Sequence, residues 1–294
     1  MLRISHLAYQ RNHHRHRSII KMKSIFLAAA ATIAVAAPAA AQTVNDWTGF
    51  YVGGRIGYAS TPLNAKERVL FDNNLDGQFG DTVTFVTGAD AFSPGFCNGD
   101  PRSSIAVEGC KTNHDGINYA VHAGADYQFG QIVVGGLVEY GRAKVESSVT
   151  GFTTTPANYY LSRELRGTLG ARARLGLDIQ GVLPYVTAGV VRAKVRSEFE
   201  TTNIPNAFAT RNGSGKQNGY RVGGGFEKKF GPLAIGALYL KTSVKDDDFR
   251  VDVTRGTAPA TNPFVRINPA GTQFRRSDKR FDTHSADLTL SYRF

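Results

Sequence analysis

Residues 47–58 read Trp-Thr-Gly-Phe-Tyr-Val-Gly-Gly-Arg-Ile-Gly-Tyr, and two sets of side chains alternate along them. One face carries Phe50, Val52, Ile56 and Tyr58, and the other carries Tyr51, Gly53, Arg55 and Gly57. A period of two indicates an extended strand, which needs neighbours for its backbone hydrogen bonds. The stretch therefore predicts a β-strand, and the fold depends on what pairs with it.

Seven further runs show the same strand-like character. They lie at 116–129, 131–145, 161–178, 182–198, 217–230, 233–245 and 281–294. Together with the run at 48–59 they make eight. The gaps between runs alternate in length, and the short ones contain turn residues such as Gly130-Gln131 and Gly231-Pro232. This pattern predicts an all-β, eight-stranded, antiparallel up-and-down barrel with tight turns at one end and four long loops at the other. The faces of 233–245 stay unassigned, because Leu238 and Leu240 compete with Ile235 and Tyr239.

Two eight-stranded barrels of opposite polarity fit this pattern. A soluble calyx places its apolar face inside, whereas a membrane barrel places that face toward lipid and encloses polar groups. The polar faces carry both signs of charge and predict a lumen network of Arg55, Asp126, Glu139, Glu164, Arg166, Arg172, Arg174, Arg192, Arg221, Glu227 and Asp287, with His122, Lys194 and Arg293 on the same faces. Charges of opposite sign can pair across a closed lumen, which offsets part of the cost of burial.

Aromatic residues favour the membrane barrel over the calyx. They gather near the strand ends, as interfacial girdles do, at Trp47, Phe50, Phe129, Tyr140, Phe230, Tyr239, Tyr292 and Phe294. The runs are also long enough, because an apolar band of about 25 Å needs roughly 9–11 tilted residues. We therefore expect a transmembrane barrel whose tight turns face the periplasm.

The N-terminal residues look like a targeting segment. Residues 22–41 have a Lys after Met22, an Ala-rich apolar run and a small-residue site before Gln42, which predicts a signal peptide cleaved between Ala41 and Gln42. The alternative, a transmembrane helix, is disfavoured because the run is short and contains Pro38. Residues 1–21 are interpreted as a start site placed too early, with a His-rich metal-binding tract as the alternative. We expect residues 42–294 to form the barrel.

The charge of the chain depends strongly on this leader. Residues 1–41 hold six of the 35 Lys and Arg residues and no acid, so residues 42–294 carry 29 basic and 24 acidic residues, a net charge of +5 instead of +11. The basic balance therefore gives little support to nucleic-acid binding. Cys97 and Cys110 are the two cysteines of an exported chain, and they predict a disulfide that staples the long first loop, 60–115.

Both ends of the barrel region resemble a known family. The family consists of small outer-membrane immunogenic, porin-like proteins of Gram-negative bacteria with an OmpA-type barrel. Trp47–Gly54 resembles their first strand, and Ser291-Tyr292-Arg293-Phe294 resembles their last strand. The resemblance implies export through the Sec pathway, location in the outer membrane, and contact with outer-membrane lipid and lipopolysaccharide. It also implies that the barrel-assembly machinery reads Leu290, Tyr292 and Phe294. The first loop is longer than the family leads us to expect, so no loop activity follows from the resemblance.

No residue pattern supports catalysis, a cofactor or a metal site. Asp72-Asn73-Asn74-Leu75-Asp76-Gly77 matches half of a calcium loop, but its twelfth position is Val83 where a bidentate Glu is required. We interpret it as a polar loop, with a weak ion site in the first loop as the alternative. His122 and Asp126 share a face but lie about 13 Å apart along the strand, which is too far for a catalytic pair. The sequence therefore predicts a monomeric, non-enzymatic barrel that supports envelope integrity and displays loops. The alternatives are a narrow diffusion channel and a loop-borne adhesin or ligand receptor.

Overall fold

The computed structural model describes residues 46–62 and 66–294. These residues belong to the compact unit Ala41–Phe294. The predictions for residues 1–21, for the signal peptide at 22–41 and for cleavage between Ala41 and Gln42 lie outside the described residues. Within the part of the chain that is described, no helix is long and apolar enough to cross a membrane.

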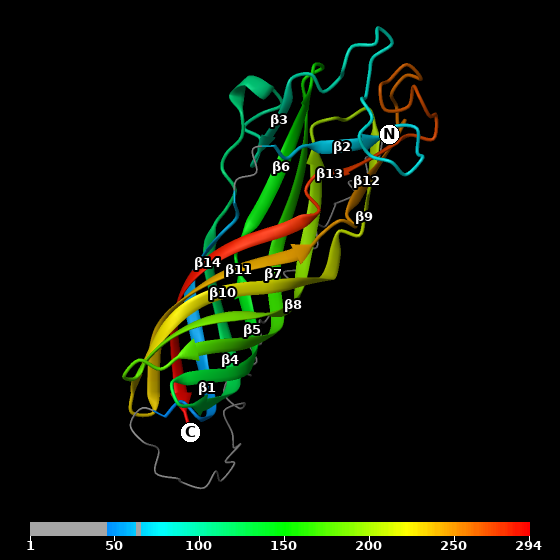
Figure 1. The fold of residues 1–294 in the computed structure, drawn as a ribbon. Helices are drawn as coiled ribbons and strands as arrows, with labels where there is room; N and C mark the ends of the chain where they lie inside the picture. The colour runs from blue at the N-terminus through cyan, green and yellow to red at the C-terminus, as the bar shows by residue number, and fades with distance from the viewer. Residues whose placement is uncertain (1–45, 63–65) are drawn as a thin grey trace, which may run out of the picture. The chain divides into compact units, whose positions relative to one another are not determined.

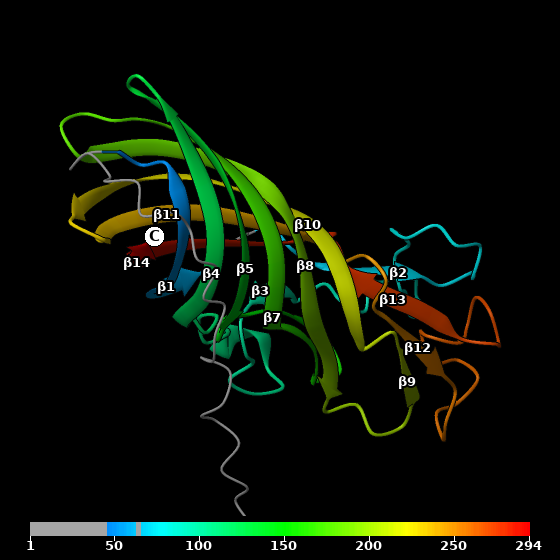
Figure 2. The same ribbon diagram turned by 90° about the horizontal axis from the view of Figure 1, so that it is seen from below.

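Eight long strands close into a barrel, which confirms the predicted fold class (Figures 1 and 2). They are β1 (Gly49–Ser60), β4 (Gly116–Phe129), β5 (Ile132–Ala143), β7 (Ala157–Leu177), β8 (Val182–Thr201), β10 (Ser214–Phe230), β11 (Leu233–Lys245) and β14 (Arg280–Arg293). Every neighbouring pair is antiparallel, and the pairings β1–β14 and β7–β8 complete the ring. A closed ring leaves none of these strands with an open edge, as a membrane barrel requires.

The first strand has the two partners that its position in an up-and-down barrel requires. On one side Tyr51 pairs with Arg293 of β14, and on the other side Phe50 pairs with Ala125 of β4. Its faces are as predicted, because Phe50 is 62% exposed on the outer wall whereas Tyr51 is 1% exposed inside. Residues 49–60 therefore form one half of the seam that joins the two ends of the sheet.

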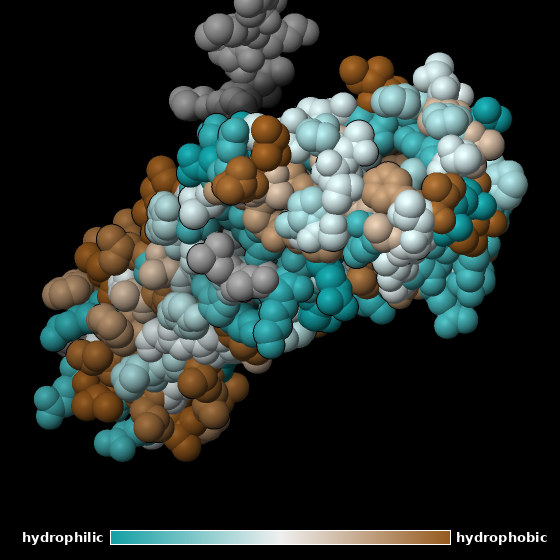
Figure 3. Space-filling model, turned by 90° about the horizontal axis from the view of Figure 1, so that it is seen from above, coloured by the Kyte–Doolittle hydropathy of each residue, from teal (hydrophilic) through white to brown (hydrophobic). Residues whose placement is uncertain are grey.

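Exposed apolar side chains cover the outer wall of the barrel between two rows of aromatic rings. The row toward the loops contains Tyr58, Tyr119, Tyr140, Tyr220 and Tyr239, and the row toward the tight turns contains Phe50, Tyr127, Phe129, Phe230, Tyr292 and Phe294. In Figure 3 the brown side chains gather over the barrel end of the face shown and give way to teal and white toward the loops. This is the pattern of a lipid-facing band with interfacial girdles.

The structure resolves the faces of β11 and corrects the position of Trp47. Ile235 and Tyr239 point outward, whereas Leu238 and Leu240 are buried in the lumen. Trp47 is completely buried, so its assignment to the outer aromatic girdle was wrong. Its indole nitrogen donates to Asp178 (3.1 Å), which holds the ring inside the turn end of the barrel.

The segments predicted as loops contain a second, smaller sheet. It has four antiparallel strands in the order β2 (Val69–Asp72), β13 (Thr272–Arg276), β12 (Arg250–Thr254) and β9 (Ala207–Arg211). These strands come from three different connections between barrel strands, so distant loops build one folded unit, which we call the cap. Because each strand has only four or five residues, the pattern that identified the barrel strands is too short to reveal them.

The first long connection is tied to the barrel by further pairing. It contains β3 (Gly95–Asn98), which pairs with β6 (Glu146–Thr153), and a short 3₁₀ helix, η1 (Ala106–Glu108). β6 in turn pairs with the part of β7 that extends beyond the barrel wall. Cys97 of β3 forms a disulfide with Cys110, with 6.0 Å between their Cα atoms. The disulfide therefore fastens the end of this connection to a strand that is already part of the sheet.

Glycines at the seam allow a close approach that a larger residue would prevent. A Cβ atom at Gly53 would lie 2.4 Å from the Leu290 carbonyl oxygen and 2.7 Å from His122 Nε2, whereas one at Gly54 would meet only the Ala120 carbonyl at 3.5 Å. We expect Gly53→Val to destabilise the barrel by about 1–3 kcal/mol through overpacking. Gly54→Val is the control and should behave like wild type in urea titrations of the barrel refolded into phospholipid vesicles. Equal stability of the two variants would contradict the packing described for the seam.

Candidate functional site

The centre of the lumen is organised around the carboxylate of Glu139 on β5, which is buried. Arg172 donates to both of its oxygens, at 3.1 Å each, from Nε and Nη2. Arg221 also donates to this carboxylate, and Arg55 reaches it at 3.4 Å. Arg55 bonds Asp287 as well, at 3.0 Å. One acidic side chain therefore joins arginines from three other strands.

A second centre lies nearer the tight turns, at the buried carboxylate of Asp126 on β4. Arg174 donates to Asp126 Oδ1 (2.8 Å) and to Glu227 (3.2 Å), and Arg293 donates to Asp126 Oδ2 (2.5 Å). A Cβ atom at Gly135, on the neighbouring strand, would overlap the Asp126 carboxylate. Glycine at 135 therefore makes the space in which this charged group lies.

Aromatic rings separate the arginines at this second centre. The guanidinium of Arg174 lies 4.7 Å from the ring centre of Tyr51, and that of Arg293 lies 4.9 Å from the same ring on β1. Arg293 also lies 5.0 Å from the ring centre of Trp47. Stacking of guanidinium on aromatic faces favours these positions for the cations in addition to their ion pairs.

Two apolar clusters accompany the charged network along the lumen. The first begins at the turn end and continues beside the network, and it contains Trp47, Val133, Leu183, Tyr185, Ala234, Leu238 and Leu240. The second lies toward the cap and contains Leu165, Val191, Ala193, Val195, Val244 and Phe281. Beyond it, Arg163 lies over the Phe281 ring and pairs with Asp246 (3.4 Å) and Asp278 (3.2 Å). Buried apolar and charged side chains thus occupy the barrel interior from the turn end to the cap.

The predicted network residues divide into two groups. The structure brings eight of them together in the lumen: Arg55, Asp126, Glu139, Arg172, Arg174, Arg221, Glu227 and Asp287, and Arg293 joins them. Glu164, Arg166 and Arg192 do not belong to the network, so their assignment to it was wrong. Arg166 pairs with Glu164 at 2.8 Å on the outer wall, and Arg192 is exposed there.

Two features of the strands explain these errors. A β-bulge between Leu165 and Gly167 shifts the alternation of β7, so Leu165 points inward although Leu169 points outward. Strand β8 keeps its alternation, but beyond Val190 its outward positions lie above the apolar band and become polar, beginning with Arg192. Polarity therefore does not identify the inner face along the whole of either strand.

Sequence patterns did not reveal the charged pairs formed by the connections. Arg276 of β13 forms a buried bidentate pair with Glu67, at 2.7 and 2.8 Å. Arg163 does not pair with the adjacent Glu164, because its partners Asp246 and Asp278 lie in the last long connection. Such pairs depend on how the connections fold together. A run of alternating residues gives no signal for them.

The cap has its own aromatic core. Its buried residues include Val69, Phe71, Phe92, Tyr159, Val251, Val253, Phe264 and Phe274. On the surface of the cap, the guanidiniums of Arg250 and Arg275 lie 4.8 and 4.5 Å from the ring centre of Phe79. Desolvation, with the added effect of the neighbouring Arg250 charge, lowers the pKa of the Arg275 guanidinium below its ordinary value.

Residues 72–77 form a polar turn rather than a set of free ligands. The Asp72 carboxylate accepts hydrogen bonds from the backbone N–H groups of Asp76 (3.1 Å) and Gly77 (2.8 Å). Asp76 in turn accepts from the backbone N–H of Gln78 (2.8 Å). These oxygens stabilise the turn by bonding its amides. These bonds explain why acidic and amide residues recur at this spacing in the turn.

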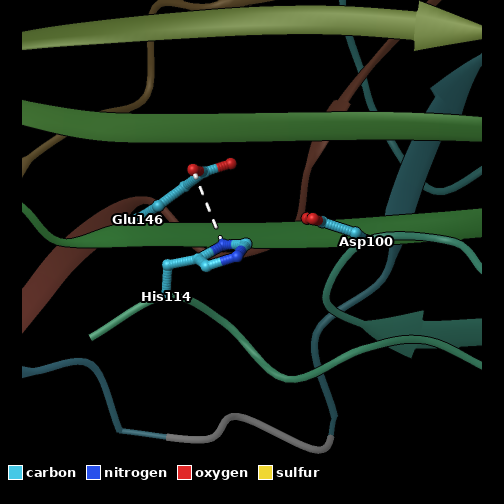
Figure 4. A group of neighbouring side chains, drawn as sticks. All are labelled: Asp100, His114 and Glu146. Atoms are coloured by element: carbon cyan, nitrogen blue, oxygen red, sulfur yellow. Dashed lines mark ion pairs between the residues drawn. The ribbon is translucent and has the colours of Figure 1, made fainter. Parts of the chain in front are cut away.

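Near the disulfide, three potential metal ligands lie close together. Asp100, His114 and Glu146 each offer one ligand atom, and these atoms lie within 4.8 Å of one another (Figure 4). His114 is 3.9 Å from Glu146 and is well exposed. The hydroxyl of Tyr160 lies 2.7 Å from an oxygen of Asp100 and 2.7 Å from an oxygen of Glu146. A phenol therefore already bridges the two carboxylates that a cation would need.

Removal of the central acid should destabilise the barrel far more than removal of an outer one. Glu139→Gln leaves Arg55, Arg172 and Arg221 without their shared anion in a buried site, and we expect a loss of about 3–5 kcal/mol. Glu164→Gln removes one partner of an exposed pair and should cost less than about 1 kcal/mol. Equilibrium urea unfolding in phospholipid vesicles measures both. Similar small losses would show that the lumen network contributes little.

Comparisons with known proteins agree with this architecture. Residues 27–294 match the family model described as outer membrane protein beta-barrel domain. A search of curated proteins found no match. The solved structures that are similar include OprG from Pseudomonas aeruginosa, with 10% identity over 85% of this chain and 98% of that one and a TM-score of 0.42.

Two other solved structures are similar at the same level. The outer membrane protease OmpT from Escherichia coli has 8% identity over 84% of this chain and 97% of that one, with a TM-score of 0.38. Neisserial surface protein A has 12% identity over 84% and 98%, with a TM-score of 0.33. These similarities are weak, so the assignment rests on the family match and on the barrel itself. The chain belongs to the outer membrane protein beta-barrel domain family and is a protein of the Gram-negative outer membrane.

Proposed function

We propose that this protein is a non-enzymatic barrel that contributes to the integrity of the outer membrane and presents its folded cap to the outside. The observation that carries the proposal is the filled lumen. Charged side chains from six strands form ion pairs with one another there, and buried apolar clusters lie beside them and toward the cap. A barrel built in this way is a rigid, closed body in the membrane.

The same observation disfavours the diffusion channel. Eight strands enclose a space only wide enough for side chains, so transport would require these side chains to move apart. Moving Arg172 away from Glu139 would leave a charge unpaired in a buried site, which costs several kcal/mol. The buried acids are also bonded to arginines, which leaves them poorly placed to act as catalytic acids or bases.

The proposal includes partners that the outer wall would meet. Leu290, Tyr292 and Phe294 are exposed along the outer face of β14, where the barrel-assembly machinery could recognise them during insertion. The apolar band would then contact outer-membrane lipid, including lipopolysaccharide. We propose that the inserted protein is a monomer, because a closed ring of eight strands completes its own hydrogen bonding.

Planar-bilayer recording tests the closed lumen. Purified wild-type protein should give no stable, reproducible single-channel steps, because the lumen does not open without breaking buried ion pairs. Arg172→Ala with Arg221→Ala removes two large side chains from the charged network and should admit intermittent current if the protein remains folded. Reproducible steps from the wild type would overturn the structural role and establish a channel. Heat-modifiability on a gel shows that each sample is folded.

A second candidate function, adhesion or ligand binding through the cap, is favoured by its exposed apolar groups. A groove of about 240 Å³ beside the aromatic core is lined by Phe85, Pro156, Ile204 and Phe264 among others. Ile204 is 90% exposed at its edge. Apolar groups that protrude from a rigid surface are typical of contact sites for other molecules.

Adhesion can be tested with a matched pair of cap variants. Non-adherent bacteria that display the wild-type protein should adhere to epithelial monolayers, and Ile204→Glu should reduce adhesion several-fold because it places a charge at the groove. Val107→Glu is the control, since Val107 is 91% exposed in η1 and does not line the groove. This function would be refuted if cells that display the wild-type protein adhered no better than cells without it. It would also be refuted if Ile204→Glu and Val107→Glu reduced adhesion equally.

A further inference from the structure

The outer wall carries a cluster of basic side chains just beyond the apolar band. Arg142 of β5, Arg166 of β7, Arg192, Lys194 and Arg196 of β8, and Lys216 of β10 line a groove of about 740 Å³, which we call the basic groove. All six side chains are exposed. Tyr140 and Leu169 of the apolar band form its edge on the membrane side, so the groove lies where lipid chains give way to headgroups.

The position of these residues along the strands places them at headgroup depth. Arg142 occupies the next outward position after Tyr140, and Arg192 the next after Val190. Two residues advance a strand by about 6–7 Å. The headgroup layer on each side of a bilayer is roughly 5–8 Å thick. The first basic residue on each strand therefore lies in the layer that holds lipid phosphates.

The charge of the groove is poorly compensated by the protein. Lys194 and Lys216 are direct partners in the β8–β10 register, and like charges in this position repel. Arg192 and Arg196 flank Lys194 on the same face of β8. Among residues 46–62 and 66–294, no carboxylate forms an ion pair with Arg192, Lys194 or Lys216. An anion between these strands would relieve the repulsion.

Acidic residues limit the direction from which that anion can come. Arg166 pairs with Glu164, and Arg196 pairs with Glu198. Both acids lie on the cap side of their partners, because β7 runs from the cap toward the turns and β8 runs the other way. Negative charge therefore faces solvent above the groove, and uncompensated positive charge faces the membrane below it. This arrangement favours an anion anchored in the bilayer over one that is free in solution.

We propose that the basic groove binds the phosphates of a phosphorylated glycolipid of the outer leaflet. The guanidiniums of Arg142 and Arg192 and the ammonium groups of Lys194 and Lys216 would contact phosphate oxygens, for which arginine forks and lysine point charges are suited. The acyl chains would lie on the apolar wall below Tyr140 and Leu169. The site deepens the proposed contact with lipopolysaccharide and rests on that part of the proposed function, but it does not depend on whether the lumen is closed.

The proposal is tested by lipid titration of the folded protein in phosphatidylcholine nanodiscs. The probes are bis-phosphorylated lipid A, the same lipid after enzymatic removal of its phosphates, and inorganic phosphate. Wild-type protein should bind lipid A at least about tenfold more tightly than the dephosphorylated lipid, and inorganic phosphate should not displace it. Equal binding of the two lipids, or displacement by inorganic phosphate at comparable concentration, would overturn the proposal.

Variants identify the groove as the site of binding. Arg192→Gln, Lys194→Gln and Lys216→Gln, combined, should weaken lipid A binding at least about tenfold, since three charged contacts are lost. The control combines Arg102→Gln, Lys245→Gln and Lys279→Gln, which removes the same charge from exposed positions outside the groove. An equal loss in both would show a general charge effect and refute the site. If the triple groove variant does not fold, Lys194→Gln alone should still weaken binding, and unchanged affinity would refute the site.

Discussion

The burial of Glu139 among three arginines is the constraint on which the barrel depends. A single carboxylate in this interior would be costly, and so would each guanidinium, but together they satisfy one another with hydrogen bonds at about 3 Å. The contributing side chains come from strands that are far apart in the chain. The network can therefore form only when the ring is closed, and it links the stability of each strand to the completeness of the barrel.

Strand positions, the order of the strands and the seam between β1 and β14 could be predicted from the sequence, because long runs with a period of two are strong local signals. The inner charges on β1, β4 and β5 followed from the same alternation. Arg166 and Arg192 could not be assigned correctly, since a bulge changes the phase of β7 and β8 continues past the membrane. On β7 the bulge breaks the alternation itself, whereas on β8 the alternation is regular but its polar face lies outside the barrel.

The cap shows a different limit of sequence reasoning. Its strands have four or five residues, and one of them pairs with a strand from the opposite end of the barrel sequence, as Phe71 of β2 pairs with Phe274 of β13. Nothing local marks Phe71 as a core residue rather than an exposed loop residue. The disulfide is an intermediate case: two cysteines in an exported chain suggest a bond, but only the pairing of β3 with β6 shows what it fastens.

The bulge beside Arg166 also has a consequence for how this architecture can change. Strand β7 serves two surroundings, lipid and lumen below the bulge and the cap above it, and one extra residue separates the two alternations. An insertion or deletion at this position would exchange the inner and outer faces of the upper half and leave the lower half untouched. The bulge thus separates two parts of one continuous strand, so that a change of register in the outer part need not disturb the packing of the membrane part.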